Sequence, residues 1–349
     1  MALSHAPLRR LAPQLVILAA VLLLNLAVFP DFFRVEFQNG RLFGGIIDVL
    51  NRGAPTAILA IGMTLVIGTR GIDLSVGAVM AIAGACAAKI VTDGHGWGTA
   101  LAGALLAGGL CGIWNGVLVA WLRIQPIVAT LVLMVAGRGI AQLVTEGTIL
   151  TFLNEGLIRL GSGTILGLPV PVAIWIALGA AMAWGVRRSA LGLLIESIGI
   201  NAAAARLAGI NARGLLVCVY LVSGLCAALA GVIVAADIKG ADANNAGLWM
   251  ELDAILAVVI GGNSLLGGRF SIIASLLGAL IIQSVNSAIL LSGMPPEFNL
   301  VIKAVLILAI LVIQSPRIGH WIYILRASGG DPAPGRAPRG GAHAKETAR

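Results

Sequence analysis

Charged residues are scarce in this chain of 349 residues: they make up 11% of it, whereas about 25% is usual for soluble domains. Hydrophobic residues make up 59%, and the mean hydropathy is +1.00. The apolar residues form long uncharged runs and do not alternate with polar ones, which excludes an ordinary soluble fold and disfavours a transmembrane β-barrel. The composition therefore predicts an all-α, polytopic membrane protein.

Cysteine, histidine and lysine are too few and too scattered for the common catalytic and metal sites. The four cysteines lie in uncharged segments, without a C-x-x-C pair or a nearby histidine at zinc-site spacing, so we expect no metal and no cofactor. None of the four lysines follows a glycine, as the ATP-binding P-loop requires. No paired carboxylates or Ser-His-Asp arrangement can be assembled, so we expect the chain not to be an enzyme.

Ten uncharged runs predict about ten transmembrane helices, some of them short or broken. The runs cover residues 11–30, 53–69, 74–88, 94–122, 124–137, 160–186, 214–236, 254–268, 270–296 and 304–316. The first run could also be a secretory signal, but no small-x-small cleavage site precedes Pro30, which favours a retained span. We expect residues 11–316 to form one transmembrane domain.

The basic residues predict how these helices are oriented. With alternate crossings and the N-terminus inside, fifteen Lys and Arg residues face the cytoplasm and six face outside. This distribution obeys the positive-inside rule and places residues 1–10 and the tail 317–349 in the cytoplasm. The tail is rich in Gly, Pro, Ala and Arg and is predicted to be disordered. The net charge of +8 is explained by residues that flank the helices, and we expect no nucleic-acid partner.

Two glycine-rich segments interrupt long apolar runs. Residues 54–88 as one helix would measure about 52 Å, which exceeds a hydrocarbon core of roughly 30 Å, so the chain must break between Thr69 and Gly77. A comparable break is expected at Gly261–Gly268. Paired, glycine-interrupted segments are typical of transporters with a path near the bilayer midplane. The predicted substrate path comprises Gly71, Asp73, Ser75, Gly77, Gly261, Gly262, Asn263 and Ser264.

Two acidic or basic side chains within the apolar regions need an explanation, because such charges are costly in lipid. Asp73 either lines the path or only accepts backbone N–H groups at the start of the next helix, and both interpretations stay open. Arg138 is expected to extend outward to the membrane interface. Because Asp73 is nearly alone, the several carboxylates of an ion-coupled carrier are not indicated.

The longest internal loop on the predicted cytoplasmic side covers residues 187–214. Asn201 can cap a short helix over residues 202–207 that stops near Gly209. This helix suits docking to a cytosolic partner, or alternatively rests on the membrane surface. The apolar side chains expected to project from the loop are Ile195, Ile198, Ile200, Leu207 and Ile210.

Small residues recur every four positions in one predicted span. Gly108, Gly112 and Gly116, extended by Ala104 and Ala120, form a ridge that allows another backbone to approach closely. The ridge could pack within the chain or between subunits, and we favour packing within the chain.

Three ordered motifs resemble the ribose-type permease subunits of bacterial ABC sugar importers, a family within the branched-chain amino acid/monosaccharide permease superfamily. The motifs are Gly71–Gly77, Gly199–Asn211 and Glu251–Gly268, and the resemblance covers about residues 45–315. The segment Lys239–Trp249 looks more particularly like the galactofuranose permeases of that family. Leu256 and Asn263 depart from the common pattern, which leaves the sugar open.

The resemblance implies a permease subunit of an ABC importer for a monosaccharide, with galactofuranose as a candidate, in the bacterial inner membrane. It also implies two cytosolic ATP-binding subunits, a periplasmic sugar-binding protein and a second permease subunit, either the same chain or a sister chain. The alternative is an ion-coupled secondary sugar carrier, which would need no such partners.

The resemblance also assigns roles to residues outside the path. Trp249, Glu251 and Asp253 are candidates for a gate or for a binding-protein dock. An interfacial tryptophan and two helix-capping carboxylates are the structural alternatives for these three residues. The region that couples to the ATPases maps onto Glu196, Gly199, Asn201, Arg206, Gly209 and Asn211.

Overall fold

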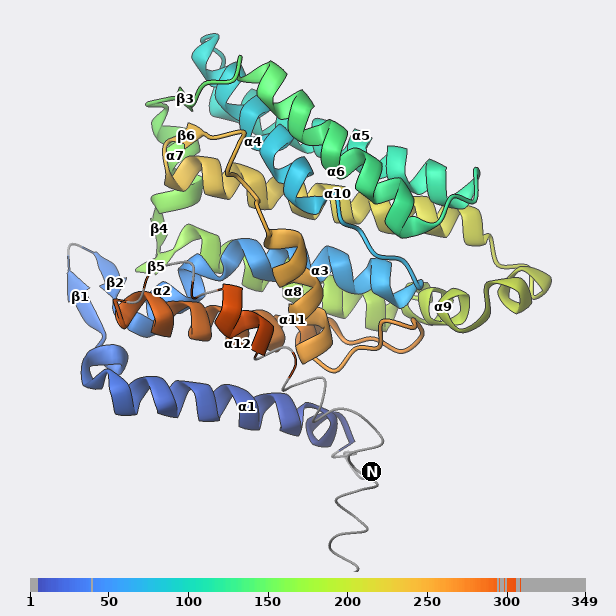
Figure 1. Ribbon diagram of the computed structural model, residues 1–349, viewed down its shortest axis with the longest axis horizontal. Helices are drawn as coiled ribbons and strands as arrows, with labels where there is room; N and C mark the ends of the chain where they lie inside the picture. Colours follow the sequence, from blue (N-terminus) through green and yellow to red (C-terminus); the bar gives the residue numbers. More distant parts are fainter. Residues whose placement is uncertain are drawn as a thin grey trace, which may run out of the picture. The chain divides into compact units, whose positions relative to one another are not determined.

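A computed structural model describes residues 6–38, 40–293, 295, 298, 300–305 and 308, and nearly all of them that form regular structure are helical (Figure 1). The predicted tail and most of the last predicted span lie outside these residues. All the elements below belong to the unit formed by residues 1–301. The helices are α1 (Ala6–Val28), η1 (Pro30–Phe33), α2 (Gly45–Arg52), α3 (Ala54–Gly68), α4 (Val76–Thr92), α5 (Trp97–Ala120), α6 (Pro126–Val144), α7 (Glu155–Ser162), α8 (Val170–Arg188), α9 (Leu191–Leu207), α10 (Ala212–Asp237), α11 (Met250–Ile260) and α12 (Ile272–Leu291).

Short strands pair only at the connections between helices. They form three antiparallel pairs: β1 (Glu36–Gln38) with β2 (Arg41–Phe43), β3 (Leu150–Thr151) with β6 (Gly240–Ala241), and β4 (Thr164–Ile165) with β5 (Leu168–Pro169). The all-α prediction is confirmed.

The described residues contain six helices that are long and apolar enough to cross a membrane. These are α1, α5, α6, α8, α10 and α12, and the pair α2 and α3, bent by 43°, makes a seventh candidate. Nine of the ten predicted runs coincide with helices here, but α4 and α11 have only 17 and 11 residues. Because a full crossing takes about 20 residues, the count of about ten crossings is not confirmed.

Both predicted breaks are confirmed. α3 ends at Gly68 and α4 begins at Val76, so the first run contains a seven-residue connection. α11 ends at Ile260 and α12 begins at Ile272, with the glycine-rich segment between them. At each break, the backbone N–H and C=O groups at the helix ends lack partners within a helix. Polar contacts are therefore needed at the breaks, whereas the rest of the backbone satisfies its hydrogen bonds within the helices.

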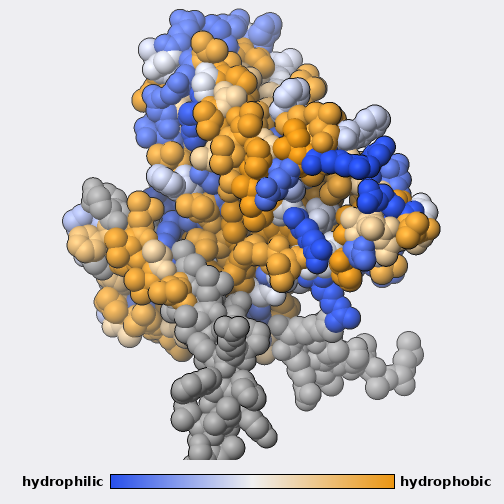
Figure 2. All heavy atoms as spheres, turned by 45° about the vertical axis from the view of Figure 1, so that its right-hand side comes forward, coloured by the Kyte–Doolittle hydropathy of each residue, from blue (hydrophilic) through white to orange (hydrophobic). Residues whose placement is uncertain are grey.

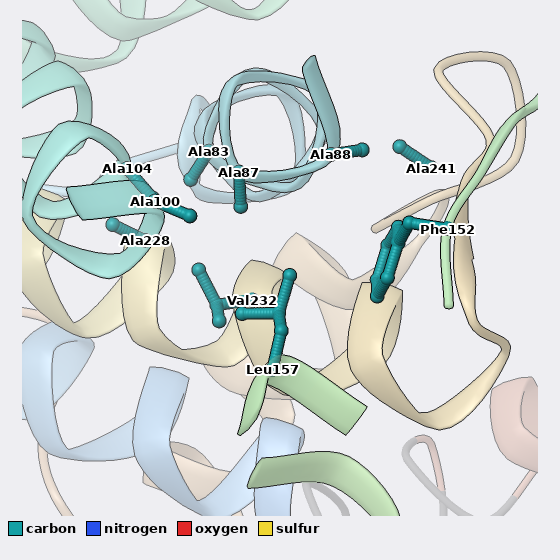
Figure 3. Packing of buried hydrophobic residues seen from close by; sticks show 10 residues of the cluster. All are labelled: Ala83, Ala87, Ala88, Ala100, Ala104, Phe152, Leu157, Ala228, Val232 and Ala241. Atoms are coloured by element: carbon teal, nitrogen blue, oxygen red, sulfur yellow. The ribbon is translucent and has the colours of Figure 1, made fainter. Parts of the chain in front are cut away.

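Small residues bring α5 against α10. A Cβ atom at Gly108 would overlap Ala228 and Gly224 of α10, and Gly112 and Gly116 lie equally close to its backbone. The ridge therefore packs within the chain, as favoured above. Next to it, buried alanines of α4, α5 and α10 meet the larger side chains of Phe152, Leu157 and Val232 (Figure 3).

The remaining helices pack around α3 and α12. α11 contacts both of them, α8 contacts α3, and α1 contacts α12 (Figure 1). Large apolar side chains remain exposed on α1, α5 and α6, and hydrophobic residues cover much of the face seen in Figure 2. Such a surface suits contact with lipid hydrocarbon.

Candidate functional site

Asp73 is the centre of a buried polar cluster at the first break. Only 2% of the residue is exposed. Its Oδ1 atom accepts hydrogen bonds from the backbone N–H (3.1 Å) and the hydroxyl (2.6 Å) of Ser75, and its Oδ2 atom accepts one from the Ser223 hydroxyl of α10 (2.8 Å). Ser75 precedes α4 and its own side chain makes no capping bond. The carboxylate thus fixes the turn before α4 and also ties that turn to α10.

The cluster extends to α5 and α6. The Asn115 amide of α5 donates to the Ser75 hydroxyl (2.8 Å), and Thr130 of α6 bonds both the Leu74 N–H and the Ile72 carbonyl (3.2 Å each). The break is therefore held from three helices that are distant in the sequence.

Two buried polar atoms of this region have no hydrogen-bond partner among the residues that the structure describes. They are Oδ1 of Asn115 and the hydroxyl oxygen of Tyr220. Tyr220 lies on α10 next to Gly71, where a Cβ atom would contact its hydroxyl. Because an unpaired buried polar group costs free energy, each such atom requires an explanation.

The α4 helix also contacts the segment that leads into α11. A Cβ atom at Gly77 would overlap the carbonyl of Gly247 and the carboxylate of Glu251, so only glycine allows this approach. Glu251 and Asp253 are buried, with 6% and 9% exposed, whereas Trp249 is half exposed and adopts the left-handed conformation (φ 65°). Trp249 occupies the N-cap position of α11, and both carboxylates belong to the first turn of this helix. The structure thus joins the first predicted path segment to the predicted gate.

The segment 239–249 is anchored on α6. One guanidinium nitrogen of Arg138 donates to the carbonyls of Ala243 (3.0 Å) and Ala246 (2.6 Å), and the Gln142 amide donates to the Asn244 side chain (2.7 Å). Arg138 thus reaches the segment 239–249, whose carbonyls compensate its charge. Its extension to the membrane interface stays a prediction.

Asp242 gives the same segment its internal order. Hydrogen bonds from the side chain of Asn245, and from the backbone N–H groups of Asn244 and Asn245, hold the pKa of the Asp242 carboxyl below its ordinary value. Asp242 is therefore ionised at neutral pH, and its carboxylate closes the turn that Arg138 anchors.

The predicted coupling region meets both breaks at one backbone junction. The Gly268 N–H donates to the Gly68 carbonyl (3.0 Å), and the Arg70 Nε donates to the Leu266 carbonyl (2.6 Å). Gly199 of α9 lies against this pair so closely that a Cβ atom would overlap Gly68 and Gly268. The end of α3, the middle of α9 and the α11–α12 connection are therefore in direct contact.

α9 is longer than the predicted helix over residues 202–207. It is helical from Leu191 and kinked at Asn201 (φ −155°, ψ 95°), whose side chain accepts the N–H groups of Ala203 and Ala204 (3.0 Å each). The predicted cap is thus confirmed, and Gly209 has the positive φ of +84° that suits a helix end.

Only some side chains of the predicted docking surface project from α9. Leu207 and Ile200 are exposed at 91% and 63%, but Ile195 and Ile198 are buried. Their predicted exposure is wrong, because Ile195 packs on Gly68 and Ile198 packs on Ala205. Of the proposed coupling residues, Gly199 is buried, Glu196 is half-buried, and Asn201, Arg206, Gly209 and Asn211 are exposed.

The second break has a polar network of its own. Oδ1 of Asn263 accepts the Ser271 N–H (2.7 Å) and its amide donates to the Ser275 hydroxyl (2.8 Å), which also receives a bond from Thr64 of α3 (2.7 Å). Gly261 packs on the backbone of α12, and Ser264 is exposed. Thr64 connects this network to α3, and no hydrogen bond among the described residues connects it to Asp73.

The sequence did not identify Asn115, Thr130, Tyr220 and Ser223 as members of the site. Each is a polar residue within an apolar run, and this position is the sequence feature that could have identified it. That signal does not reveal which polar residues meet, because the contacts join different helices.

A family model and several known proteins match most of this chain. The family model described as the permease component of the branched-chain amino acid transport system matches residues 45–311. The galactofuranose transporter permease protein YtfT of Escherichia coli is 60% identical over 306 residues, which cover 87% of this chain and 89% of that protein. No solved structure matches the chain.

Two further relatives are import permeases for other sugars. The fructose import permease protein FruF of Bifidobacterium longum is 40% identical, covering 82% of this chain and 83% of that protein. The ribose import permease protein RbsC of Escherichia coli is 38% identical, covering 88% and 94%. The chain belongs to the branched-chain amino acid transport system permease family, which confirms its resemblance to the ribose-type permease subunits of ABC sugar importers.

Proposed function

We propose that this chain is the transmembrane subunit of an importer that carries a monosaccharide of the galactofuranose class across the bacterial inner membrane. Identity of 60% over most of the length of a galactofuranose permease supports this sugar over fructose and ribose, whose permeases are 40% and 38% identical. Permease subunits of this family are not enzymes, and ATP is hydrolysed by partner subunits.

The observation that supports ATP-driven transport most strongly is the junction of Gly68, Gly199 and Gly268. A force applied to the exposed end of α9 reaches both helix breaks through backbone contacts that contain no flexible side chain. Closely packed interiors transmit displacement and absorb little of it. We infer that two cytosolic ATP-binding subunits push on α9, and that Leu207 is one of the side chains they contact.

The polar cluster at the first break suits a sugar. Sugar hydroxyls both donate and accept hydrogen bonds, and the cluster contains a carboxylate, two serine hydroxyls and an amide next to the Tyr220 hydroxyl. We infer that movement at the junction exposes this cluster to the passing sugar, which then pairs with the unpartnered atoms of Asn115 and Tyr220.

The segment 239–249 is proposed as the outer gate. It joins the end of α10 to α11, is anchored by Arg138 and packs on Gly77 at the start of α4. Its half-exposed Trp249 has the apolar ring that a sugar face or a binding protein would contact. In this proposal a periplasmic sugar-binding protein docks on that side, and a second permease subunit, a copy or a sister chain, completes the pore.

A tagged copy of the chain recovered from native membranes tests the proposal. We expect it to capture an ATP-binding subunit, and the ATPase rate of the purified assembly to rise with a galactofuranose-loaded binding protein more than with a ribose- or fructose-loaded one. Leu207→Ser should lose the ATPase subunit without loss of folded protein, while Leu166→Ser, also exposed but on the β4–β5 turn, serves as the matched control. Recovery of the chain alone, transporting sugar in proteoliposomes under an ion gradient, would establish the secondary carrier instead.

A further inference from the structure

A cavity of about 510 Å³ lies between α1, the end of α8 and the connection that leads into α12. Its volume falls in the range of roughly 300–1,000 Å³ that is usual for small-ligand sites. Leu11, Val186 and Ile273 give part of the wall an apolar character, while Arg187 and Arg269 contribute guanidinium groups. The cavity is separate from the Asp73 cluster, with which it shares no residue.

No acidic residue in the described part of the chain forms an ion pair with either guanidinium group at the cavity. Among the described residues, neither Arg187 nor Arg269 makes a hydrogen bond or an ion pair, and both are exposed. Arg187 lies in the last turn of α8 and Arg269 in the connection before α12, on the side that the positive-inside distribution places in the cytoplasm. Two unpaired arginines beside one cavity attract an anion.

The first turn of α12 adds to this positive character. Ser271 caps the helix by accepting the Ala274 N–H, which leaves the N–H groups of Ile272 and Ile273 without a partner among the described residues. Both residues line the cavity. The first N–H groups of a helix carry partial positive charge and bind phosphate groups.

Gln14 supplies a buried polar group at the opposite wall. Only 8% of the residue is exposed, and its amide donates to the Gly261 carbonyl (2.9 Å). Its Oε1 atom is buried and accepts no hydrogen bond from any described residue. A ligand that carries a hydroxyl as well as a negative charge would complete the hydrogen bonding at this wall.

We propose that the cavity binds the headgroup of an anionic phospholipid such as phosphatidylglycerol. Its phosphate would be held by Arg187, Arg269 and the first turn of α12, and its glycerol hydroxyls would approach Gln14. Its acyl chains would pass along the apolar wall into the membrane. Basic pockets between transmembrane helices at the cytoplasmic side bind anionic lipid headgroups in this way. The lipid would fix α1 to the second break and thereby stabilise one arrangement of the connection beside α9.

Native mass spectrometry of the full-length chain in detergent, titrated with defined lipids, tests this site. We expect phosphatidylglycerol to bind roughly tenfold or more tightly than phosphatidylethanolamine, and the variant Arg187→Gln/Arg269→Gln to lose this preference, since each arginine near anionic lipid contributes substantially. Arg188→Gln changes the neighbouring arginine, which does not line the cavity, and should keep the preference within about twofold of the unmodified chain.

Three results would contradict the lipid site. The first is equal loss of lipid preference in the double variant and in the Arg188→Gln control. The second is displacement of phosphatidylglycerol by millimolar inorganic phosphate, which would assign the cavity to a free anion. The third is unchanged lipid binding in the double variant together with weaker capture of an ATP-binding subunit, which would assign these arginines to a protein partner.

Discussion

The Asp73 carboxylate has a structural role in its turn, and we also propose a role in transport for it. It accepts three hydrogen bonds, two from its own turn and one from α10, so its removal leaves several donors unpaired. Leaving a buried donor unsatisfied costs about 1–3 kcal/mol. The same carboxylate oxygens would accept hydrogen bonds from a sugar hydroxyl if the cluster opens. The structural interpretation of Asp73 and the transport interpretation are therefore compatible. They predict different effects of substituting this residue on stability and on sugar uptake.

Asp73→Asn is expected to keep the fold. The amide oxygen can still accept both bonds from Ser75, and the amide N–H can donate to the Ser223 hydroxyl, which also accepts hydrogen bonds. Asp73→Ala should lower the stability by at least about 1–3 kcal/mol, because three donors lose their acceptor. Thermal unfolding in detergent measures the difference between the two variants.

Sugar uptake by the same two variants separates structure from transport. If the carboxylate serves only the turn, Asp73→Asn should transport at nearly the normal rate. If it also contacts the sugar, uptake should fall while the unfolding temperature stays close to that of the unmodified chain. Unfolding of Asp73→Asn as early as Asp73→Ala would show that the hydrogen-bond exchange described above is wrong.

Residues other than glycine adopt positive φ angles at several helix ends, including those at the first break and the proposed gate. Arg70 after α3, Lys239 after α10 and Trp249 before α11 all adopt positive φ angles (66°, 55° and 65°), which are uncommon for residues other than glycine. All three flank the first break or the proposed gate. The backbone of these connections is therefore held in a conformation that the surrounding contacts determine.

The contact between α4 and the segment 239–249 depends on the absence of a side chain at Gly77. Gly77→Ala should lower stability by about 1–3 kcal/mol and weaken the gate, because the methyl group would overlap Gly247 and Glu251. Limited proteolysis within the segment 239–249, together with thermal unfolding, would detect this change.

Gly139→Ala is the matched control for that variant. Gly139 lies within α6, with no atom within 4 Å of the position that a Cβ would take. Alanine has the higher helix propensity, so this variant should be neutral or more stable by up to about 1 kcal/mol. Equal effects of the two substitutions would rule out the close approach at Gly77.

Within the described part of the molecule, packing differs between the α4–α5–α10 core and the connections at the two breaks. α10 contacts α3, α4 and α5. Buried alanines of α4, α5 and α10 pack together (Figure 3), and Gly108 meets Gly224 between α5 and α10, so that these helices pack closely. The connections at both breaks join this packed region to α9. We therefore infer that transport changes the connections more than the α4–α5–α10 core.

The orientation of the chain follows from its basic residues and can be tested separately. A green fluorescent protein fused after Arg349 should fluoresce, since it folds in the cytoplasm, where the excess of Arg and Lys places the C-terminus. Alkaline phosphatase inserted after Gly94, in the turn between α4 and α5, should be active outside. The opposite pattern would mean that the positive-inside rule fails for this chain.

The membrane class and both helix breaks were predictable from the amino-acid sequence. Scarce charge, long apolar runs and glycine-rich interruptions are local properties of the sequence. The thickness of the hydrocarbon core sets how many apolar residues a crossing needs, so a run that is too long must break. The Asn201 cap and the small-residue ridge were predictable for the same reason, since each depends on residues within about four positions.

Contacts between distant segments were not predictable in this way. Ser223 meets Asp73 across 150 positions, Arg138 reaches carbonyls more than 100 positions away, and Gly199 lies against Gly68 and Gly268. The burial of Ile195 was missed because it depends on that junction. Close packing in three dimensions selects these partners, and no local pattern records which apolar or polar residues will meet.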